Sequence, residues 1–383
     1  MTAEELEDGG RLLLHLRLLP GLGDRRIARL LRASRSTAEL EEAARTHAHR
    51  WCRSRGTSFP SRREIARQAR ELREKCHELG VRIVVRGSDD YPPPLENLPD
   101  PPHVLFLRGD PDLLNRRIVT VVGARKCTPT GRRTARSLGR ELAEAHVVVM
   151  SGLALGIDGA VHQGALDAGG DTVAVLGSGP DVAHPPSHAR LFKTIGEQGL
   201  LISEFLPGTP PRAHHFPRRN RILAALPHGV VVVEASRGSG ALITANQALD
   251  LRPEVMAVPG DLEDSGVQGN LDLFRDGAFV AWGAQDVFKH LRWSWPPGGT
   301  RSEPEEGDVG MEASNIEESL ILSRLAAVGP QSVDELIRTV GLPPHRLLAT
   351  LSALEVDGRI ESASDGKVLL PRKPASVGSR EGS

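Results

Sequence analysis

Hydrophobic residues in the middle of the chain recur as short uninterrupted runs, separated by stretches with helical spacing. The runs are rich in Val, Ile and Leu, and turns marked by glycine follow several of them. Continuous apolar runs of this kind are typical of parallel strands that helices cover on both faces. The expected strands are Ile118–Val122, Val147–Met150, Thr172–Leu176, Leu200–Glu204, Val230–Glu234 and Glu254–Val258, and the expected helices are Arg132–Ala145, Ile157–Ala168, Ser187–Gln198 and Thr244–Leu251. The pattern predicts a Rossmann-like, doubly wound α/β fold with a mostly parallel sheet.

The N-terminal part has a different pattern. Leu12–Pro20 has helical spacing, Gly21–Gly23 interrupts it, and a second amphipathic run covers Asp24–Leu31. This pattern predicts a helical domain of the helix-hairpin-helix or SAM-like kind over residues 1–87. Such a hairpin can offer backbone N–H groups to a DNA phosphate, with Arg25 and Arg26 nearby. The alternative is a plain helical hairpin that packs its leucines.

A proline-rich segment joins this helical domain to the Rossmann-like domain, which is expected over residues 88–292. A short strand is expected at Val81–Arg86. Tyr91–Pro94 and Pro99–Pro102 then exclude helix, because proline lacks the N–H donor and restricts the residue before it. Residues 88–115 are therefore predicted to be a stiff, proline-rich and non-helical entry segment of this domain.

The C-terminal part is predicted to be a linker followed by a small domain. Residues 293–315 are rich in Pro, Gly and Glu, which predicts a flexible linker. Residues 316–371 hold three helical runs and then a β-hairpin pattern, the order of a winged helix, and residues 372–383 are expected to be a disordered tail. The third helix carries His345 and Arg346 near its start and acidic residues at its end. We therefore expect it to contact protein, or DNA weakly, rather than read the major groove.

Composition narrows the function classes. The chain has 383 residues, which predicts two or three domains, and a formal net charge of -1. A near-neutral chain does not coat nucleic acid through bulk charge, so an anion site must be local. Three cysteines without metal-ligand spacing favour a reducing cytoplasm and no metal. No apolar run reaches the roughly 18 residues of a membrane span, and no secretory signal is visible, so a cytoplasmic protein without membrane contact is expected.

The stretch Arg212–Arg221 concentrates cations beside a single aromatic side chain, Phe216. Arginine forks match phosphate oxygens, and a phenylalanine face can stack on any base. The stretch lies between two expected strands, near the carboxyl edge of the sheet, where open α/β sheets bind ligands. The alternative is that the arginines are surface ion-pair partners and that Phe216 belongs to the core.

Three turns that follow strands open helices at the same edge. They are Gly123–Gly131, Ser151–Gly156 and Ser239–Thr244. Their backbone N–H groups and helix dipoles favour one anion-binding zone for a polyanion. Neither the G-x-G-x-x-G dinucleotide motif nor the G-x-x-x-x-G-K-[ST] motif is present, so no cofactor such as NAD or ATP is expected.

An enzymatic alternative rests on two carboxylates. Glu204 and Glu234 each end an expected strand, and they could act as general acid and base in cleaving the glycosidic bond of a nucleotide. They could instead orient the arginines beside them. Asp158 and His162 stand at i,i+4 spacing and can pair on one helix face, which is more often a structural bond than a catalytic dyad. No serine sits in a G-x-S-x-G elbow.

Eight motifs in this order resemble the DNA-processing protein A family (DprA, also called Smf). The motifs are Val121–Arg125, Ser151–Asp158 with His162, Val173–Gly177, Ile202–Glu204, Phe216–Arg221, Val233–Ala235, Ser239–Thr244 and Ala257–Gly260. The resemblance covers residues 91–282 strongly, and both flanking domains are similar to the family's optional domains. It implies a non-enzymatic, cofactor-free homodimer that binds and protects single-stranded DNA and helps to load the RecA recombinase during natural transformation.

The resemblance also implies the site residues. Arg125, Arg212 and Phe216 match the positions that line the family's basic pocket for single-stranded DNA. The positions that shape or support this pocket are matched by Gly123, Ser151, Gly152, Arg219, Asn220 and Arg221, with Ser239, Gly240 and Thr244 from the third turn. The chain departs from the family at His184-Pro185, where Tyr-Pro is usual, and at Ala241, where a serine is usual.

The family dimerises through a region that matches Val255–Ala281, and its RecA surface overlaps that region. Leu273 and Phe274 are the apolar contacts that we expect there. A third function class, a structural adaptor that acts through the winged helix, predicts instead that deletion of residues 316–383 removes all activity.

Overall fold

The computed structural model of the protein describes most of the chain. The described residues are 12–34, 36–251, 253–260, 264–295, 318, 321–322, 324–325, 328–340, 344–356, 359–362 and 367–370. They fall in two compact units, Met1–Gly299 and Thr300–Ser383, each with its own hydrophobic core. The predicted linker beyond residue 295 and the predicted tail 372–383 lie outside the described residues.

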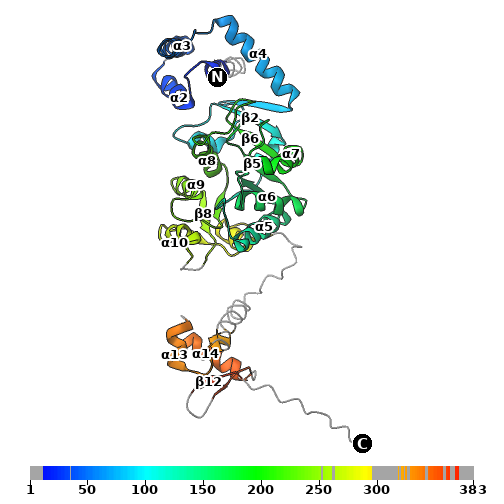
Figure 1. Ribbon diagram of the computed structural model, residues 1–383, viewed down its shortest axis with the longest axis vertical. Helices are drawn as coiled ribbons and strands as arrows, with labels where there is room; N and C mark the ends of the chain where they lie inside the picture. The colour runs from blue at the N-terminus through cyan, green and yellow to red at the C-terminus, as the bar shows by residue number, and fades with distance from the viewer. Residues whose placement is uncertain are drawn as a thin grey trace, which may run out of the picture. The chain divides into compact units, whose positions relative to one another are not determined.

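Within the described residues, one nine-stranded sheet forms the centre of the N-terminal unit (Figure 1). Its order is β1-β2-β6-β5-β4-β3-β7-β8-β9, and only the pairs β1–β2 and β2–β6 are antiparallel. The strands are β1 (Val81–Val85), β2 (Val104–Gly109), β3 (Ile118–Val122), β4 (Val148–Ser151), β5 (Thr172–Val175), β6 (Leu200–Ser203), β7 (Gly229–Val232), β8 (Glu254–Ala257) and β9 (Phe279–Val280). The mostly parallel sheet that the sequence predicted is confirmed.

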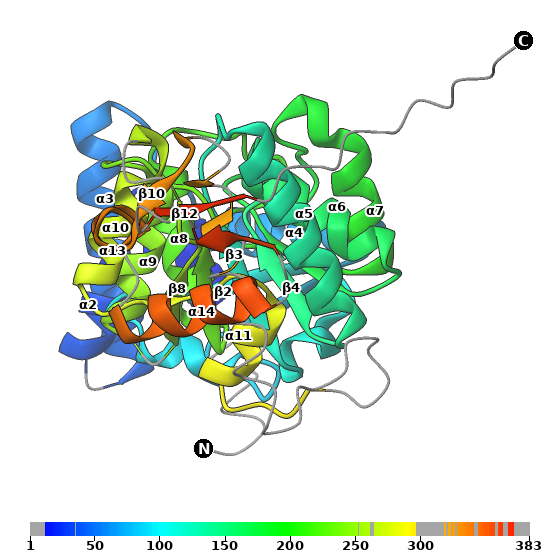
Figure 2. The same ribbon diagram turned by 90° about the horizontal axis from the view of Figure 1, so that it is seen from below.

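Helices cover both faces of this sheet. The α-helices are α2 (Asp24–Ala33), α3 (Thr37–Arg55), α4 (Arg62–Glu78), α5 (Pro129–Glu144), α6 (Ile157–Asp167), α7 (Ala189–Gln198), α8 (His215–Ala225), α9 (Gly240–Leu249), α10 (Gln268–Arg275) and α11 (Ala284–His290). Residues 12–18 are also helical. The 3₁₀ turns are η1 (Pro93–Asn97), η2 (Pro111–Asn115), η3 (Pro186–His188) and η4 (Ser265–Val267). Helices α8, α9 and α10 lie on one face, and α5, α6, α7 and α11 on the other (Figures 1 and 2).

Alternation along the central strands explains the two layers. In β3, Val122 packs toward α8 and α9, whereas Val121 packs toward α5 and α6. In β7, Val232 packs on the same face as Val122, and Val231 packs on the same face as Val121. Because both faces of these strands are buried, their sequences read as continuous apolar runs. The doubly wound prediction is therefore confirmed.

Two elements of the N-terminal unit did not follow from the sequence pattern. Strand β2 lies inside the predicted entry segment and pairs with β1 from Val81–Arg108 to Val85–Val104, so the expected boundary after residue 87 falls between two paired strands. Helix α8 contains Pro217, but proline is tolerated in a first helical turn, where its missing N–H needs no partner. Because buried arginines interrupt the apolar spacing of α8, the sequence pattern did not predict this helix.

The predicted N-terminal helical hairpin is present. Residues 12–18 are helical, Gly21 has a φ of 75°, and α2 follows. Their leucines form a small core with Ile27 and with α3. Leu14 and Cys76 also pack against Phe106 of β2, so the helices share a hydrophobic cluster with the edge of the sheet.

The C-terminal unit has the predicted winged-helix order. Its elements are a helical stretch that includes residues 318, 321–322 and 324–325, then β10 (Gln331–Ser332), α13 (Val333–Val340), α14 (Pro344–Val356), β11 (Glu361–Ser362) and β12 (Lys367–Leu369). The strands pair in the order β10-β12-β11 around a core that includes Leu336, Leu351 and Val368. The side chains of His345 and Arg346 lie outside the part of the chain that the structure describes.

Candidate nucleic-acid interface

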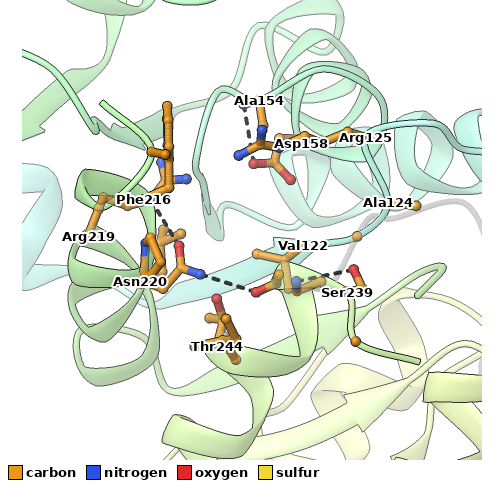
Figure 3. Close-up of a pocket in the computed structure, with 18 of the residues that line it drawn as sticks. Val122, Ala124, Arg125, Ala154, Asp158, Phe216, Arg219, Asn220, Ser239 and Thr244 are labelled. Carbon is orange, nitrogen blue, oxygen red and sulfur yellow. Dashed lines mark hydrogen bonds between the residues drawn. The ribbon is translucent and has the colours of Figure 1, made fainter. Parts of the chain in front are cut away.

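A cavity of about 700 Å³ opens at the carboxyl ends of β3 and β7. The turn after β3, the start of α6, the first half of α8 and the loop before α9 form its walls (Figure 3). The predicted site residues that line it are Gly123, Arg125, Arg212, Phe216, Arg219, Asn220, Ser239, Gly240 and Thr244. The convergence of the three glycine-marked turns is therefore confirmed, with Ala154 as the contribution of the Ser151–Gly156 turn.

A cation and an aromatic ring face each other inside this cavity. The exposed Arg125 places its Cζ 4.9 Å from the ring centroid of the half-buried Phe216. A Cβ at Gly177 would stand 2.8 Å from the Phe216 ring, so only glycine leaves room for the ring there. The alternative that Phe216 belongs to the core is wrong, because its ring forms part of the cavity wall.

The ring of His184 lies near Phe216 on this wall, with 5.7 Å between the two ring centroids. Burial, and then the nearby Arg125 cation, lower the pKa of His184. The imidazole is therefore neutral near pH 7. It extends the aromatic surface without adding charge.

Arg219 serves the cavity as a support. Its side chain is buried, and Nη1 donates to the carbonyl oxygens of Gly152 (2.6 Å) and Val175. Burial lowers the pKa of Arg219 to about 10, which the neighbouring Asp158 opposes. A Cβ at Gly152 would stand 2.4 Å from Arg219 Nη1, so this guanidinium occupies the space that Gly152 leaves. Arg219 thus fastens the loop between β4 and α6 beneath the cavity.

Asn220 and Ser239 hold the third turn. Asn220 Nδ2 donates to the carbonyl of Gly240 (3.1 Å), and Ser239 Oγ accepts from the N–H of Ala241 at the start of α9 (3.3 Å). Figure 3 shows both bonds on the same side of the cavity. The N-terminus of α9, which begins at Gly240 rather than at the predicted Thr244, therefore opens onto the cavity.

Three predicted site residues lie behind the cavity wall. Ser151 is buried and donates to the carbonyl of Val121 (2.6 Å), and Gly152 lies against Arg219. Arg221 is turned away, and its Nη2 donates to Glu204 Oε2 (2.7 Å). These residues therefore support the fold around the cavity, and the first two brace its floor.

The two carboxylates of the enzymatic alternative are both engaged in structural contacts. Glu204 is 1% exposed, its Oε2 also lies 3.0 Å from Arg218 Nη2, and burial raises the pKa of Glu204 to about 7. Glu234 accepts from the N–H (3.0 Å) and hydroxyl (2.8 Å) of Thr128, the N-cap residue of α5. The expectation that the carboxylates orient arginines holds for Glu204, whereas the hydrogen bonds of Glu234 go to Thr128.

The predicted Asp158–His162 pair is wrong. His162 Nδ1 instead bonds to Thr172 Oγ1 (2.6 Å), because the ring points toward β5. Asp158 accepts from the N–H of Ala154 (3.3 Å), and burial raises the pKa of Asp158, opposed first by Arg219.

Sequence reasoning missed two cations at the cavity. Lys126 lines it directly after Arg125, and it is exposed. Arg237 lines it from the loop before α9, although its guanidinium also pairs with Asp272 at 2.7 Å. The position of Lys126 beside the end of a predicted strand was the available signal.

The expected dimer contacts need a correction. Leu273 is 2% exposed and packs in the main core, because the apolar face of α10 faces the sheet, and Phe274 packs partly against the same core. Exposed apolar side chains lie instead on and after the edge strand β9, where Trp282 is 74% exposed. Phe279 and Val280 are exposed beside it.

The described residues contain neither a candidate membrane-spanning helix nor a candidate metal cluster. No helix among them is both long and apolar enough to cross a membrane. No group of three or more His, Cys, Asp or Glu side chains in the described ranges has an arrangement that could hold a metal ion.

Comparison with known sequences gives two family matches. The sequence model of DNA recombination-mediator protein A matches residues 82–292, and that of the DprA winged helix domain matches residues 311–366. Protein Smf of Escherichia coli is 36% identical over 323 residues, which cover 82% of this chain and 83% of that protein. DNA processing protein DprA of Streptococcus pneumoniae is 43% identical over 206 residues, which cover 54% of this chain and 73% of that protein.

Solved structures give the same grouping. The crystal structure of DprA from Streptococcus pneumoniae has a TM-score of 0.61 and 31% identity, and it covers 74% of this chain and 97% of that chain. A structure described as showing the single-stranded DNA binding mode of DprA from Helicobacter pylori has a TM-score of 0.51 and 27% identity, and it covers 55% of this chain and 95% of that chain.

Proposed function

The chain belongs to the DNA recombination-mediator protein A family, and from this premise we propose that its cavity at the carboxyl edge of the sheet binds single-stranded DNA. The observation that carries the proposal is the exposed Arg125 guanidinium, which lies over the half-buried Phe216 ring. A base can stack on the ring while its phosphate binds the cation. Paired bases inside a duplex have no free face for the ring.

The charges around the cavity support this proposal. The cationic side chains that line it are Arg125, Lys126, Arg212, Arg219 and Arg237, whereas Asp158 is the one carboxylate among the described lining residues. The N-terminus of α9 adds N–H donors and a favourable dipole end. Because none of these groups reads a base edge in a fixed pattern, binding is expected to tolerate any sequence and to weaken with salt.

The wider role follows from the family. We propose that the chain protects an incoming single strand in the cytoplasm and assists loading of the RecA recombinase, in natural transformation or recombination, as a homodimer without a cofactor. The exposed apolar residues Phe279, Val280 and Trp282 support an interface at the β9 edge. None of the described residues that line the proposed DNA cavity belongs to that edge, so DNA and a protein partner can bind together.

The test is binding of fluorescent oligothymidine to the wild type and to Arg125→Ala/Phe216→Ala, as single strand and as duplex, over a salt series. Loss of one stacking contact costs about 1–3 kcal/mol, so we expect single-strand binding to fall by at least about fivefold. Arg140→Ala is the matched control, because Arg140 is exposed on α5 and pairs with Glu144 away from the cavity. Equal binding by the double variant and the wild type would show that the cavity is not the DNA site.

A further inference from the structure

A second cavity lies beside the proposed DNA cavity, between the N-terminal hairpin and α8. Its volume is about 670 Å³. The arginines that line it are Arg25, Arg26 and Arg29 of α2 and Arg218 and Arg221 of α8. Figures 1 and 2 both show α2 on the side of the sheet that carries α8 and α9. We call this space the α2 cavity.

The two cavities share a wall. Pro217 and Ile243 line both of them, and Ile243 is 40% exposed. Helix α8 separates the two spaces, with Phe216 on the side of the DNA cavity and Arg218 on the side of the α2 cavity. A linear polymer that leaves the DNA cavity across Pro217 and Ile243 therefore enters the α2 cavity.

The α2 cavity has more positive charge than its own carboxylates neutralise. Asp100 is the acidic residue among its described lining residues, and it pairs with Arg25 (3.2 Å) and lies 3.5 Å from Arg221. Glu204 behind the wall pairs with Arg218 and Arg221. Five lining arginines thus face two carboxylates.

Three of these arginines have donors to spare. Arg29 makes no ion pair within the described ranges, and Arg26 is exposed while its Nη1 donates to the carbonyl of Gly21 (2.8 Å). Arg221 is 4% exposed, and its Nη1 has no acceptor among the described residues. Gly23, the N-cap residue of α2, provides no side-chain cap and also lines the cavity. An anion with several oxygens can accept from the exposed guanidinium groups of Arg26 and Arg29, whereas Arg221 Nη1 is buried behind the cavity wall.

We propose that the α2 cavity is a second phosphate-binding site for the same single strand whose base stacks on Phe216. The strand crosses Pro217 and Ile243, and its following phosphates bind Arg26 and Arg29. The described lining of the α2 cavity holds five arginines and a single aromatic ring, that of His214, so its donors suit the phosphates of the strand. The inference rests on the proposed function of the first cavity, and it assigns DNA contact to the N-terminal hairpin.

The experiment measures oligothymidine affinity against length for the wild type, for Arg125→Ala/Phe216→Ala and for Arg26→Ala/Arg29→Ala. The shortest oligomer fills the first cavity alone, and longer ones also reach α2. We expect Arg26→Ala/Arg29→Ala to bind the shortest oligomer as the wild type does and to lose the gain in affinity with length. Its salt slope for long oligomers is expected to fall by about 1.4, because each phosphate contact on a single strand contributes about 0.7.

Two controls separate charge from folding. Arg32→Ala removes an exposed arginine of α2 that does not line the cavity, and it is expected to keep the full gain with length. Arg26→Lys/Arg29→Lys keeps the charge and is expected to restore most of the gain. A length dependence identical in the wild type and in Arg26→Ala/Arg29→Ala overturns the inference.

The remaining outcomes distinguish the two proposals. If Arg125→Ala/Phe216→Ala keeps short-oligomer binding, the proposed function of the first cavity fails, whatever the α2 variants do. Thymidine monophosphate and inorganic phosphate are titrated as competitors at the same ionic strength. If either displaces the long oligomer from the α2-dependent site as well as an oligomer does, the α2 cavity is a free-anion site and the strand path is wrong.

Discussion

At the residue scale, burial gives neighbouring arginines different tasks. Arg125 is exposed and lies over Phe216, whereas Arg219 is 3% exposed and its Nη1 already donates to two carbonyl oxygens. A phosphate can therefore bind the first guanidinium without breaking a bond inside the protein. If Arg219 bound a phosphate instead, the carbonyl oxygens of Gly152 and Val175 would lose their donor.

His162 shows how one buried hydrogen bond fixes a protonation state. Thr172 Oγ1 has one proton and donates it to the carbonyl of Val149 (2.7 Å), so His162 Nδ1 must be the donor in the 2.6 Å bond to Thr172. His162 Nε2 is then unprotonated, and it has no partner among the described residues. Burial lowers the pKa of His162 to about 3, since a charged ring would place an unsatisfied N–H in the core.

This protonation state predicts a pH-dependent contribution to stability. The folded-state pKa of His162 lies below the unfolded value of about 6.5, so its contribution is present above pH 6.5 and is lost as the pH falls. We expect His162→Gln to be less stable than the wild type at neutral pH. The difference in unfolding free energy between the wild type and His162→Gln narrows below pH 6.5, by up to about 1.4 kcal/mol per pH unit.

The measurement is urea unfolding at a series of pH values, followed by tryptophan fluorescence. The four tryptophans all lie in the N-terminal unit, so the signal reports on that unit alone. A difference in unfolding free energy that stays constant or widens as the pH falls would contradict the neutral state of the buried His162 ring.

At the scale of elements, α5 depends on a carboxylate from a neighbouring strand end. Thr128 Oγ1 accepts from the N–H of Gly131 (2.9 Å) and donates to Glu234, which follows β7. The charge of Glu234 also favours the N-terminus of α5. These bonds close the segment between β3 and α5, which carries Arg125 into the DNA cavity.

Substitution of Glu234 distinguishes a structural role of this residue from a catalytic role. We expect Glu234→Gln to lower the unfolding free energy by about 1–2 kcal/mol, because a charge-assisted bond becomes a neutral one. Neither the wild type nor the variant is expected to hydrolyse a nucleoside monophosphate, and single-strand binding at low temperature is expected to persist. Turnover by the wild type that Glu234→Gln abolishes would instead support the nucleotide-processing alternative.

Helix α8 organises the whole cationic edge. Its first turns present Phe216 to one cavity, and Arg218 and Arg221, three residues apart, to the other. Residues at this spacing share a helix face. The sequence placed these side chains in one cluster, but the helix divides them between two cavities.

At the scale of the whole molecule, the two compact units have separate hydrophobic cores. Every described residue of the proposed DNA cavity belongs to the N-terminal unit. We therefore expect a chain that ends at Gly299 to bind oligothymidine within about twofold of the full chain. Complete loss of binding in the truncated chain, with its tryptophan fluorescence unchanged, would favour the adaptor class that acts through the winged helix.

The sequence by itself determined the central fold and pointed to the residues of the proposed site. Continuous apolar runs indicate strands buried on both faces, and glycine-marked turns after them indicate where helices begin. Phe216 was identified because it is the single aromatic residue in a cationic stretch between two strands, whereas Arg125 was identified by its match to a motif of the family. These features are local, so the order of residues is enough to reveal them.

Only the tertiary structure decided which charged groups remain available. Arg219 and Arg221 are as cationic in sequence as Arg125, yet packing buries both of them against carbonyl or carboxylate oxygens. It also brought α2 beside α8, where Arg25 meets Asp100. Exposure and contacts between distant segments depend on the packed three-dimensional arrangement, because residues far apart along the chain supply the partners, and no local pattern encodes them.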